Sequence, residues 1–264
     1  MTSPDNTNKL PGNTNFAIVA HTEGDISEPW NLLRKNPFWL LDCGPETISL
    51  LAELDAFKQL QGVIITHAHT DHSGGLASLA YRMMFIEKCR IPLIAPLDVF
   101  QLLSQQLVEL QYLLTPKAVT LGAPKSSSST FFNIVPLHPD FLKGRHEYVP
   151  ANYCHFTLSF FPVDHNIQDF PSYGVKIYTP SSKQIWFSGD TAYPLEGMNE
   201  AYMVFHDTQT YNPGDGYEVH CPYRKLREVV PIPQRGMIIL CHTQPQEQFT
   251  EHGFKHAKRW SVFS

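Results

Sequence analysis

Residues 66–75 read THAHTDHSGG and bring three imidazoles and a carboxylate together in one short segment, at His67, His69, Asp71 and His72. Nitrogen and carboxylate donors at this density are typical of a transition-metal site. Side chains two apart on an extended segment project to the same side, so His67 and His69 can bind one ion. A turn after them would carry Asp71 and His72 toward a second ion. The alternative is a histidine cluster in a surface loop that binds no metal.

The surrounding sequence favours the metal site. The apolar run 63–65 is β-branched and lies between Gly62 and the pair Gly74 and Gly75. Such a run, bounded by glycines, predicts a strand that ends where the histidines begin. Ligands that follow directly after a strand are positioned by the rigid backbone of the sheet.

The pattern resembles the His-x-His-x-Asp-His motif of the metallo-β-lactamase superfamily. The other motifs of that superfamily follow in the expected order, at Asp42 in LDCG, His165 in VDH, Asp190 in SGDT and His242 in LCH. The resemblance therefore extends over residues 41–242, most of the chain. It implies an α/β fold, the αβ/βα four-layer sandwich, and alternation of predicted strands and helices along the chain fits such layers.

The resemblance also implies how the ligands are divided. His67, His69 and His165 would hold a first ion, Asp71, His72 and His242 a second, and Asp190 would bridge them. Zinc suits neutral imidazole and carboxylate donors, although manganese or iron would accept the same ligands. The expected chemistry is hydrolysis by a water whose pKa the ions lower toward neutrality.

Some of these residues have a plainer explanation when taken singly. His165 alone could be a core or surface histidine, and Asp190 and His242 alone are equally weak indications. Asp42 ends a strand before Gly44, where aspartate commonly organises a turn through its own backbone. The resemblance implies instead that Asp42 supports the metal loop. We favour the turn and do not count Asp42 as a ligand. Cys43 and Cys241 are interpreted as small buried side chains rather than ligands.

Other residues bear on the reaction. Residues 172–191 resemble the hairpin of the tRNase Z-like phosphodiesterases, and that branch carries an acid in a His-acid-x-Thr segment and a later histidine, here Asp207 and His220. A phosphodiester leaves as a basic alkoxide, so a histidine oriented by a carboxylate can speed departure as a general acid. With Asp71, these two are the predicted catalytic residues. The alternative is that His220 merely precedes a helix at 224–229.

Composition and missing motifs bear on the substrate. Formal net charge is −5 and the sequence pI is about 6.2, which disfavours a large polyanion such as tRNA or DNA. The tRNA-processing members carry a basic arm, but the helical part of the insertion predicted at 96–150, residues 99–114, is largely apolar and uncharged apart from Glu109. The serine run 126–130 of the insertion is interpreted as a mobile loop. No arginine follows closely after His242, where the tRNA-processing enzymes have one. The basic stretch 255–259 is interpreted as a solvated end.

These features favour a small nucleotide, and the chain resembles the small cyclic-nucleotide phosphodiesterases of the branch, including the anti-Pycsar type that degrades cyclic-nucleotide immune signals. The alternatives are a tRNA 3′-processing endoribonuclease, a lactone or thioester hydrolase, and a protein that binds without turnover.

The predicted organisation is a disordered segment at 1–15 and one domain at 16–264. Strands are expected at 16–20, 38–41, 62–65, 91–95, 132–135 and 153–163, and helices at 46–60, 76–88 and 99–114. No secretory signal or membrane span is predicted, and five cysteines without CxxC spacing fit reduced thiols, so we expect a cytoplasmic protein. The apolar face of 99–114 packs on the core or on a second copy. We favour packing of this face on the core of the same chain, although the resemblance implies a homodimer.

Overall fold

The computed structural model describes residues 15–19, 29–114, 131–137, 156–209, 218–242 and 252–257, with the side chains of 29, 106–114 and 136 excepted. The predictions for the segment 1–14, the serine run 126–130 and residues 153–155 lie outside these ranges. The boundaries of the predicted domain and of its insertion at 96–150 stay predictions.

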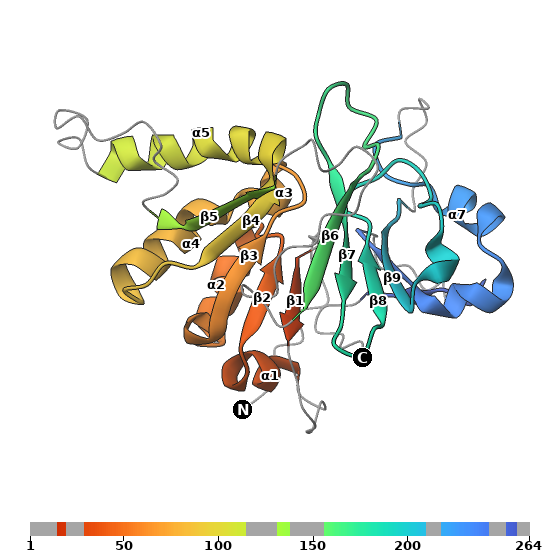
Figure 1. Ribbon diagram of the computed structural model, residues 1–264, viewed down its shortest axis with the longest axis horizontal. Coiled ribbons are helices and arrows are strands. Elements are labelled where there is room, and N and C mark those ends of the chain that lie inside the picture. The colour runs from red at the N-terminus through yellow and green to blue at the C-terminus, as the bar shows by residue number, and fades with distance from the viewer. Residues whose placement is uncertain are drawn as a thin grey trace.

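Two sheets form the centre of the molecule (Figure 1). The first has the order β1-β2-β3-β4-β5, and its strands are β1 (Phe16–Val19), β2 (Phe38–Leu41), β3 (Leu60–Ile64), β4 (Pro92–Pro96) and β5 (Asn133–Leu137). The second has the order β11-β10-β9-β8-β7-β6, and its strands are β6 (Thr157–Pro162), β7 (Tyr173–Tyr178), β8 (Gln184–Phe187), β9 (Met203–Asp207), β10 (Ile238–Cys241) and β11 (Lys255–His256). The predicted strands lie within a few residues of these.

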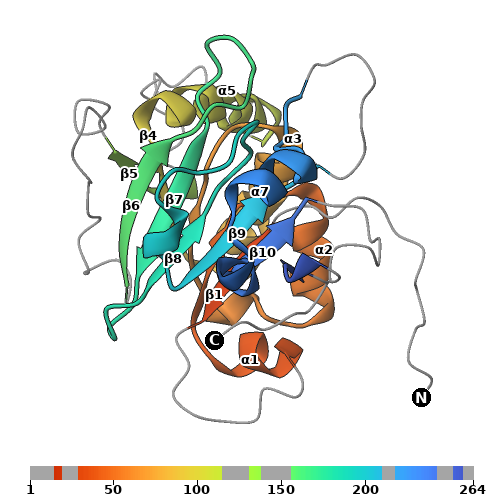
Figure 2. The same ribbon diagram turned by 90° about the vertical axis from the view of Figure 1, so that its right-hand side faces the viewer.

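Helices cover the outer faces of the two sheets, as the two views show (Figures 1 and 2). On the side of the first sheet lie α1 (Pro29–Lys35), α2 (Pro45–Glu53), α4 (Leu76–Tyr81) and α5 (Leu97–Leu114), and on the side of the second lies α7 (Tyr223–Val229). The short turns are α3 (Thr70–Ser73), η1 (Phe57–Gln59), η2 (Arg82–Ile86), η5 (Met198–Glu200) and η6 (Ile232–Met237). This αβ/βα sandwich confirms the predicted fold.

The main core lies between the sheets. Ile64 and Leu93 of the first sheet and Val175 of the second are fully buried in one continuous apolar cluster. A second cluster under α7 contains Val204, Leu226 and Leu240. Burial on both faces explains why the central strands are rich in aliphatic residues.

The predicted helix at 46–60 was too long. It ends at Glu53, because Asp55 adopts a left-handed conformation with φ 49°. The backbone N–H of Ala56 then bonds the carbonyl of Leu51, and Phe57 turns into the core. Helices commonly end at a left-handed residue, but such a residue is usually glycine, so little in the sequence indicated the break.

The helices at 76–88 and 99–114 occur where they were predicted, with two refinements. After Tyr81 the first continues as the π-helical turn η2. In α5, Val99 and Leu103 are fully buried against the core, while Leu102 is partly exposed. Packing on the core is therefore confirmed for Val99 and Leu103 and not for Leu102, the other residue of this face whose side chain the structure describes. None of the described helices combines the length and apolarity needed to cross a bilayer.

Strand direction explains where functional side chains gather. β2 and β3 run parallel, as do β8, β9 and β10, so the carboxyl ends of each set lie at one edge of their sheet. β6 shares the direction of β8 because each is antiparallel to β7. Ligands of open α/β sheets bind outside the carboxyl ends of the strands. The two edges meet at the site described next.

Candidate metal centre

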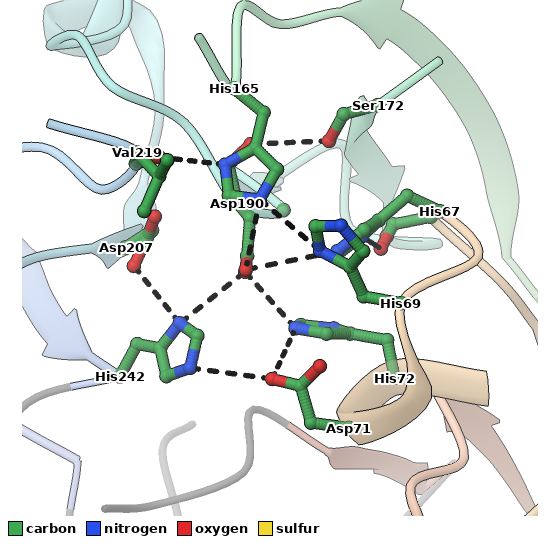
Figure 3. A network of polar contacts seen from close by, with 12 residues as sticks. His67, His69, Asp71, His72, His165, Ser172, Asp190, Asp207, Val219 and His242 are labelled. Atoms are coloured by element: carbon green, nitrogen blue, oxygen red, sulfur yellow. Dashed lines mark hydrogen bonds and ion pairs between the residues drawn. The ribbon is translucent and has the colours of Figure 1, made fainter. Parts of the chain in front are cut away.

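The predicted ligands from both sheets converge around Asp190 (Figure 3). Three groups of side chains have ligand atoms close enough to hold a metal ion, and all three include Asp190. They are His67, His69, His165 and Asp190; Asp71, His72, Asp190 and His242; and Asp190, Asp207, His220 and His242. The first two groups match the division that the resemblance implied. The structure thus brings every predicted site residue into one cluster, while their roles as ligands stay predictions.

Three histidines around Asp190 are held in a defined tautomer. Thr66 Oγ1 donates to the carboxylate of Asp42, so it accepts from Nδ1 of His67 at 3.0 Å. Nδ1 of His165 donates to the carbonyl of Val219 at 2.6 Å, and Nδ1 of His72 donates to Asp42 at 2.8 Å. Each ring, when neutral, consequently carries its lone pair on Nε2, the nitrogen that faces Asp190.

The spacing of the donor atoms suits a small divalent ion. Ligands about 2.0–2.2 Å from a tetrahedral ion lie about 3.3–3.6 Å from one another. Nε2 of His165 is 3.3 Å from Nδ1 of His69, and Oδ2 of Asp71 is 3.4 Å from Nε2 of His72 and 3.5 Å from Nε2 of His242. These three distances fit the range, and the carboxylate of Asp190 lies close to it, at 3.7 Å from His67, 3.8 Å from His165 and 3.1 Å from His72.

Unpartnered polar atoms at the centre point to the same conclusion. Among the described residues, Nε2 of His67 is buried without a hydrogen-bond partner, and Oδ1 of Asp190 is buried with ion-pair contacts to His72 and His242. Buried polar groups are ordinarily paired, and leaving one unpaired is costly. Bound cations would satisfy atoms of this kind, so the residues present fit a divalent metal.

The pKa shifts show that the buried carboxylates of this site favour positive charge beside them. Burial opposes ionisation of Asp190, but the charges and hydrogen bonds of His72 and His242 outweigh it and hold its pKa well below the usual range. Burial likewise disfavours the charged form of His242, yet Asp190, Asp207 and Asp71 raise its pKa to about 12. By contrast, burial lowers the pKa of His67, His69 and His165. Ionised carboxylates and neutral imidazoles are the forms that bind metal.

Asp207 and His220 lie beside these groups. Oδ2 of Asp207 accepts from Nδ1 of His220 at 2.9 Å and from the backbone N–H of Thr191 at 2.9 Å. Its other oxygen, Oδ1, is 3.3 Å from Nδ1 of His242. One buried carboxylate therefore faces both a candidate ligand and His220.

The preferred interpretation of Asp42 as a turn residue was wrong. Its carboxylate accepts from the backbone N–H of Thr66, from the Thr66 hydroxyl and from His72, so it supports the metal loop. The left-handed conformation of Asp42, with φ 63°, directs the side chain away from its own strand. Cys43 and Cys241 are buried free thiols, as predicted.

We expect Asp42→Asn to weaken binding of the second ion. Asparagine tolerates the left-handed backbone, so the change removes the charge and the acceptor that orients His72 directly, while His67 is affected only indirectly, through Thr66. Loss of such a partner typically costs about 10–100-fold in metal affinity. Asp55→Asn is the matched control, because Asp55 is exposed and also left-handed. Titration with zinc against a chelator checks this, and equal affinities for the two variants would contradict it.

Glycines allow the metal loop to dock closely on the end of β2. The backbone N–H of Gly75 bonds the carbonyl of Cys43, and a Cβ at Gly75 would lie 2.4 Å from the carbonyl oxygen of Gly44. We expect Gly75→Ala to lower the free energy of unfolding by about 1–3 kcal/mol, the usual cost of overpacking. Gly236→Ala is the control, since its Cβ would meet nothing within 4 Å. Thermal unfolding of both variants measures the difference, and similar melting temperatures would refute the prediction.

Several supporting contacts were not predicted from the sequence. Thr66 and the carbonyl of Val219 orient ligands, and Phe170 stacks on His69. Thr66 is adjacent to the motif, which is the one available indication. The other two depend on contacts between distant segments, which a single sequence does not show.

Solved structures of known proteins share the fold of this chain. The metallo-β-lactamase fold protein YhfI from Bacillus subtilis superimposes with a TM-score of 0.61 at 18% identity, covering 84% of this chain and 85% of that one. The short form of human tRNase Z gives a TM-score of 0.55 at 18% identity, covering 94% and 91%. The chain is thus a metallo-β-lactamase-fold protein with a cluster of candidate metal ligands at the expected edge.

Within that class the family is also clear. The family model described as anti-Pycsar protein Apyc1 matches residues 31–261, and the chain belongs to this family. Relatives of that name occur in Bacillus phage 010DV004, at 25% identity over 81% of both chains, and in Bacillus phage BSP38, at 25% identity over 90% of this chain and 86% of that one. The predicted resemblance is confirmed at the level of the family.

Proposed function

We propose that the protein is a metal-dependent phosphodiesterase that hydrolyses a small cyclic nucleotide. The observation that carries this proposal is the 2.9 Å contact between His220 and Asp207 beside the candidate metal ligands. Hydrolysis of an activated acyl group can proceed without an added acid, whereas a phosphodiester with an alkoxide leaving group gains from one. Membership in the anti-Pycsar protein Apyc1 family supports a nucleotide substrate.

His220 is placed to reach both solvent and the cluster. Its side chain is 20% exposed, while that of Asp207 is 1% exposed. The ring centroid of His220 lies 4.3 Å from that of His242 and 5.3 Å from that of His165. A substrate bound at the candidate ligands would therefore have His220 at its side.

The proposed steps need few groups of this chain. Divalent cations held by the first two groups supply polarisation of the phosphoryl oxygens and acidification of a water. Asp207 fixes the proton of His220 on Nδ1, and when the ring is charged Nε2 carries the second proton. As a water oxygen forms a new bond to phosphorus and loses its proton to solvent, the bond between phosphorus and the leaving oxygen breaks, and Nε2 gives its proton to that leaving oxygen. Asp207 stabilises the charged imidazole before the transfer.

Charge supports a small substrate over a nucleic acid. The chain has 20 Lys and Arg against 25 Asp and Glu. Nucleic-acid binding draws on clustered cations that neutralise phosphates. A cyclic nucleotide carries a single phosphate and needs no such surface. Two zinc ions, a homodimer and a cytoplasmic location stay part of the proposal.

The test is a substrate panel with purified protein and bound metal quantified. We expect hydrolysis of bis(p-nitrophenyl) phosphate and of at least one cyclic nucleotide, loss of activity with a chelator, and recovery with zinc. Absence of any phosphodiester turnover at full metal occupancy would contradict the proposal. Cleavage of 3′-extended tRNA alone, or of lactones or thioesters alone, would replace it by one of the alternative hydrolases.

A further inference from the structure

The candidate ligand histidines differ in what holds their rings. His67, His72 and His165 each use Nδ1 for a hydrogen bond to Thr66, to Asp42 or to a backbone carbonyl. His69 is different. Within the described part of the chain, its recorded nitrogen contact is to Nε2 of His165, at 3.3 Å. His69 and His165 are both predicted ligands of the first ion, so the contact would give way to a bound ion.

His69 lacks a hydrogen bond of this kind among the described residues, and an aromatic ring packs against its imidazole instead. Phe170 stacks on His69 with ring centroids 4.3 Å apart and planes inclined by 21°. The same ring meets His67 edge-on at 6.0 Å and lies 6.5 Å from His165. Phe170 thus contacts the three imidazoles of the first group.

The loop that carries Phe170 is itself fixed to the site. The backbone N–H of Phe170 bonds the carbonyl of Ile167, and Asp169 turns the chain with φ 57°. Nδ2 of Asn166 donates to the carbonyl of Glu218, and the Ser172 hydroxyl donates to the carbonyl of Asp190. The position of the ring is therefore set by the segments that also carry His220 and Asp190.

We propose that Phe170 is a positioning residue for His69, which holds the imidazole in the orientation that binds the first ion. A histidine ring turns through a broad torsional range about its second side-chain bond, so an isolated imidazole must be ordered when it binds. Stacking restricts that rotation without occupying either nitrogen. The proposal rests on the metal centre of the proposed function but requires no particular substrate.

The stack gives a measurable expectation. An offset aromatic pair contributes an amount equivalent to about 2- to 10-fold in an equilibrium constant. We expect Phe170→Leu to weaken binding of the first ion by roughly that factor and to leave the second ion unaffected. Phe170→Tyr keeps the stacked ring and is expected to retain the original affinity.

The experiment is competition for zinc between the full-length protein and a chelator, with cadmium NMR to distinguish the two ions. Asp71→Asn, which changes a residue of the second group alone, identifies the signal of the second ion. Phe161→Leu is the matched control, because Phe161 is a half-buried aromatic residue that packs on Trp186 rather than on a histidine.

Selective weakening of the first ion in Phe170→Leu, with recovery in Phe170→Tyr, would support the proposal. If Phe170→Leu weakened the binding of both ions equally, Phe170 would have only a structural role and the proposal would be wrong. The proposal would also be overturned if Phe170→Leu bound the first ion as tightly as Phe161→Leu does. The experiment measures metal binding and does not depend on catalytic turnover. A protein that binds two ions but hydrolyses no phosphodiester would therefore contradict the proposed function and leave this inference standing.

Discussion

Asp190→Asn is expected to abolish phosphodiester hydrolysis and to lower the affinity for both ions. The carboxylate is common to all three groups of candidate ligands, and it is buried, with 2% of its side chain exposed. Asparagine keeps the shape but removes the charge that draws cations to the centre. Because loss of a residue that merely supports a ligand costs about 10–100-fold, we expect turnover to fall by more than about 100-fold.

Bound metal and turnover must be measured together for this variant. Glu196→Gln is the matched control, since it neutralises an exposed carboxylate in the loop that follows Asp190. The circular dichroism spectrum should match that of the unmodified protein. An Asp190→Asn protein that retained both ions and most of its activity would refute the proposed centre.

The second large effect is expected from His220→Ala. General acid catalysis contributes about 10²–10⁴-fold, so hydrolysis of a cyclic nucleotide should slow by that factor. Bis(p-nitrophenyl) phosphate has a weakly basic leaving group that departs without a proton, and its hydrolysis should change much less. Metal content should stay the same, because His220 lies outside the first two groups. Rates for the two substrates measure the contrast.

Asp207→Asn provides an internal comparison for His220. It removes the partner of His220, so it should show the same contrast between substrates. It also alters the carboxylate oxygen that lies 3.3 Å from Nδ1 of His242, so we expect weaker binding of the second ion as well. His252→Ala serves as the control for loss of an imidazole outside all three groups. Equal slowing of both substrates by His220→Ala would argue against general acid catalysis.

The site could be predicted from the sequence because its residues are ordered along strands. His67 and His69 follow directly after β3, and the later motifs each follow a strand of the second sheet. Residue type and strand-end position are both local properties, and parallel strands bring their ends together without further information. Asp207 and His220, which the structure places 2.9 Å apart, were indicated by the resemblance to the phosphodiesterase branch, and general acid catalysis supplied a chemical role for them.

What the sequence did not predict depends on contacts between distant segments. Asp42 has the surroundings of a turn residue, and its contact with His72 spans thirty positions. Phe170 is one of 17 phenylalanines, and its stacking on His69 depends on the path of a loop. The end of α2 is set by the backbone of Asp55 and by burial of Phe57. In each case tertiary packing, rather than local preference, decides the outcome.

The origin of the candidate ligands has a consequence for the molecule as a whole. His67, His69, Asp71 and His72 follow β3 of one sheet, whereas His165, Asp190 and His242 follow strands of the other. Ions bound between them would fasten the two halves of the sandwich together at one edge. Metal that binds the folded chain and not the unfolded one adds to stability through mass action. The resistance of the protein to heat and to proteolysis would then increase with the concentration of the cation.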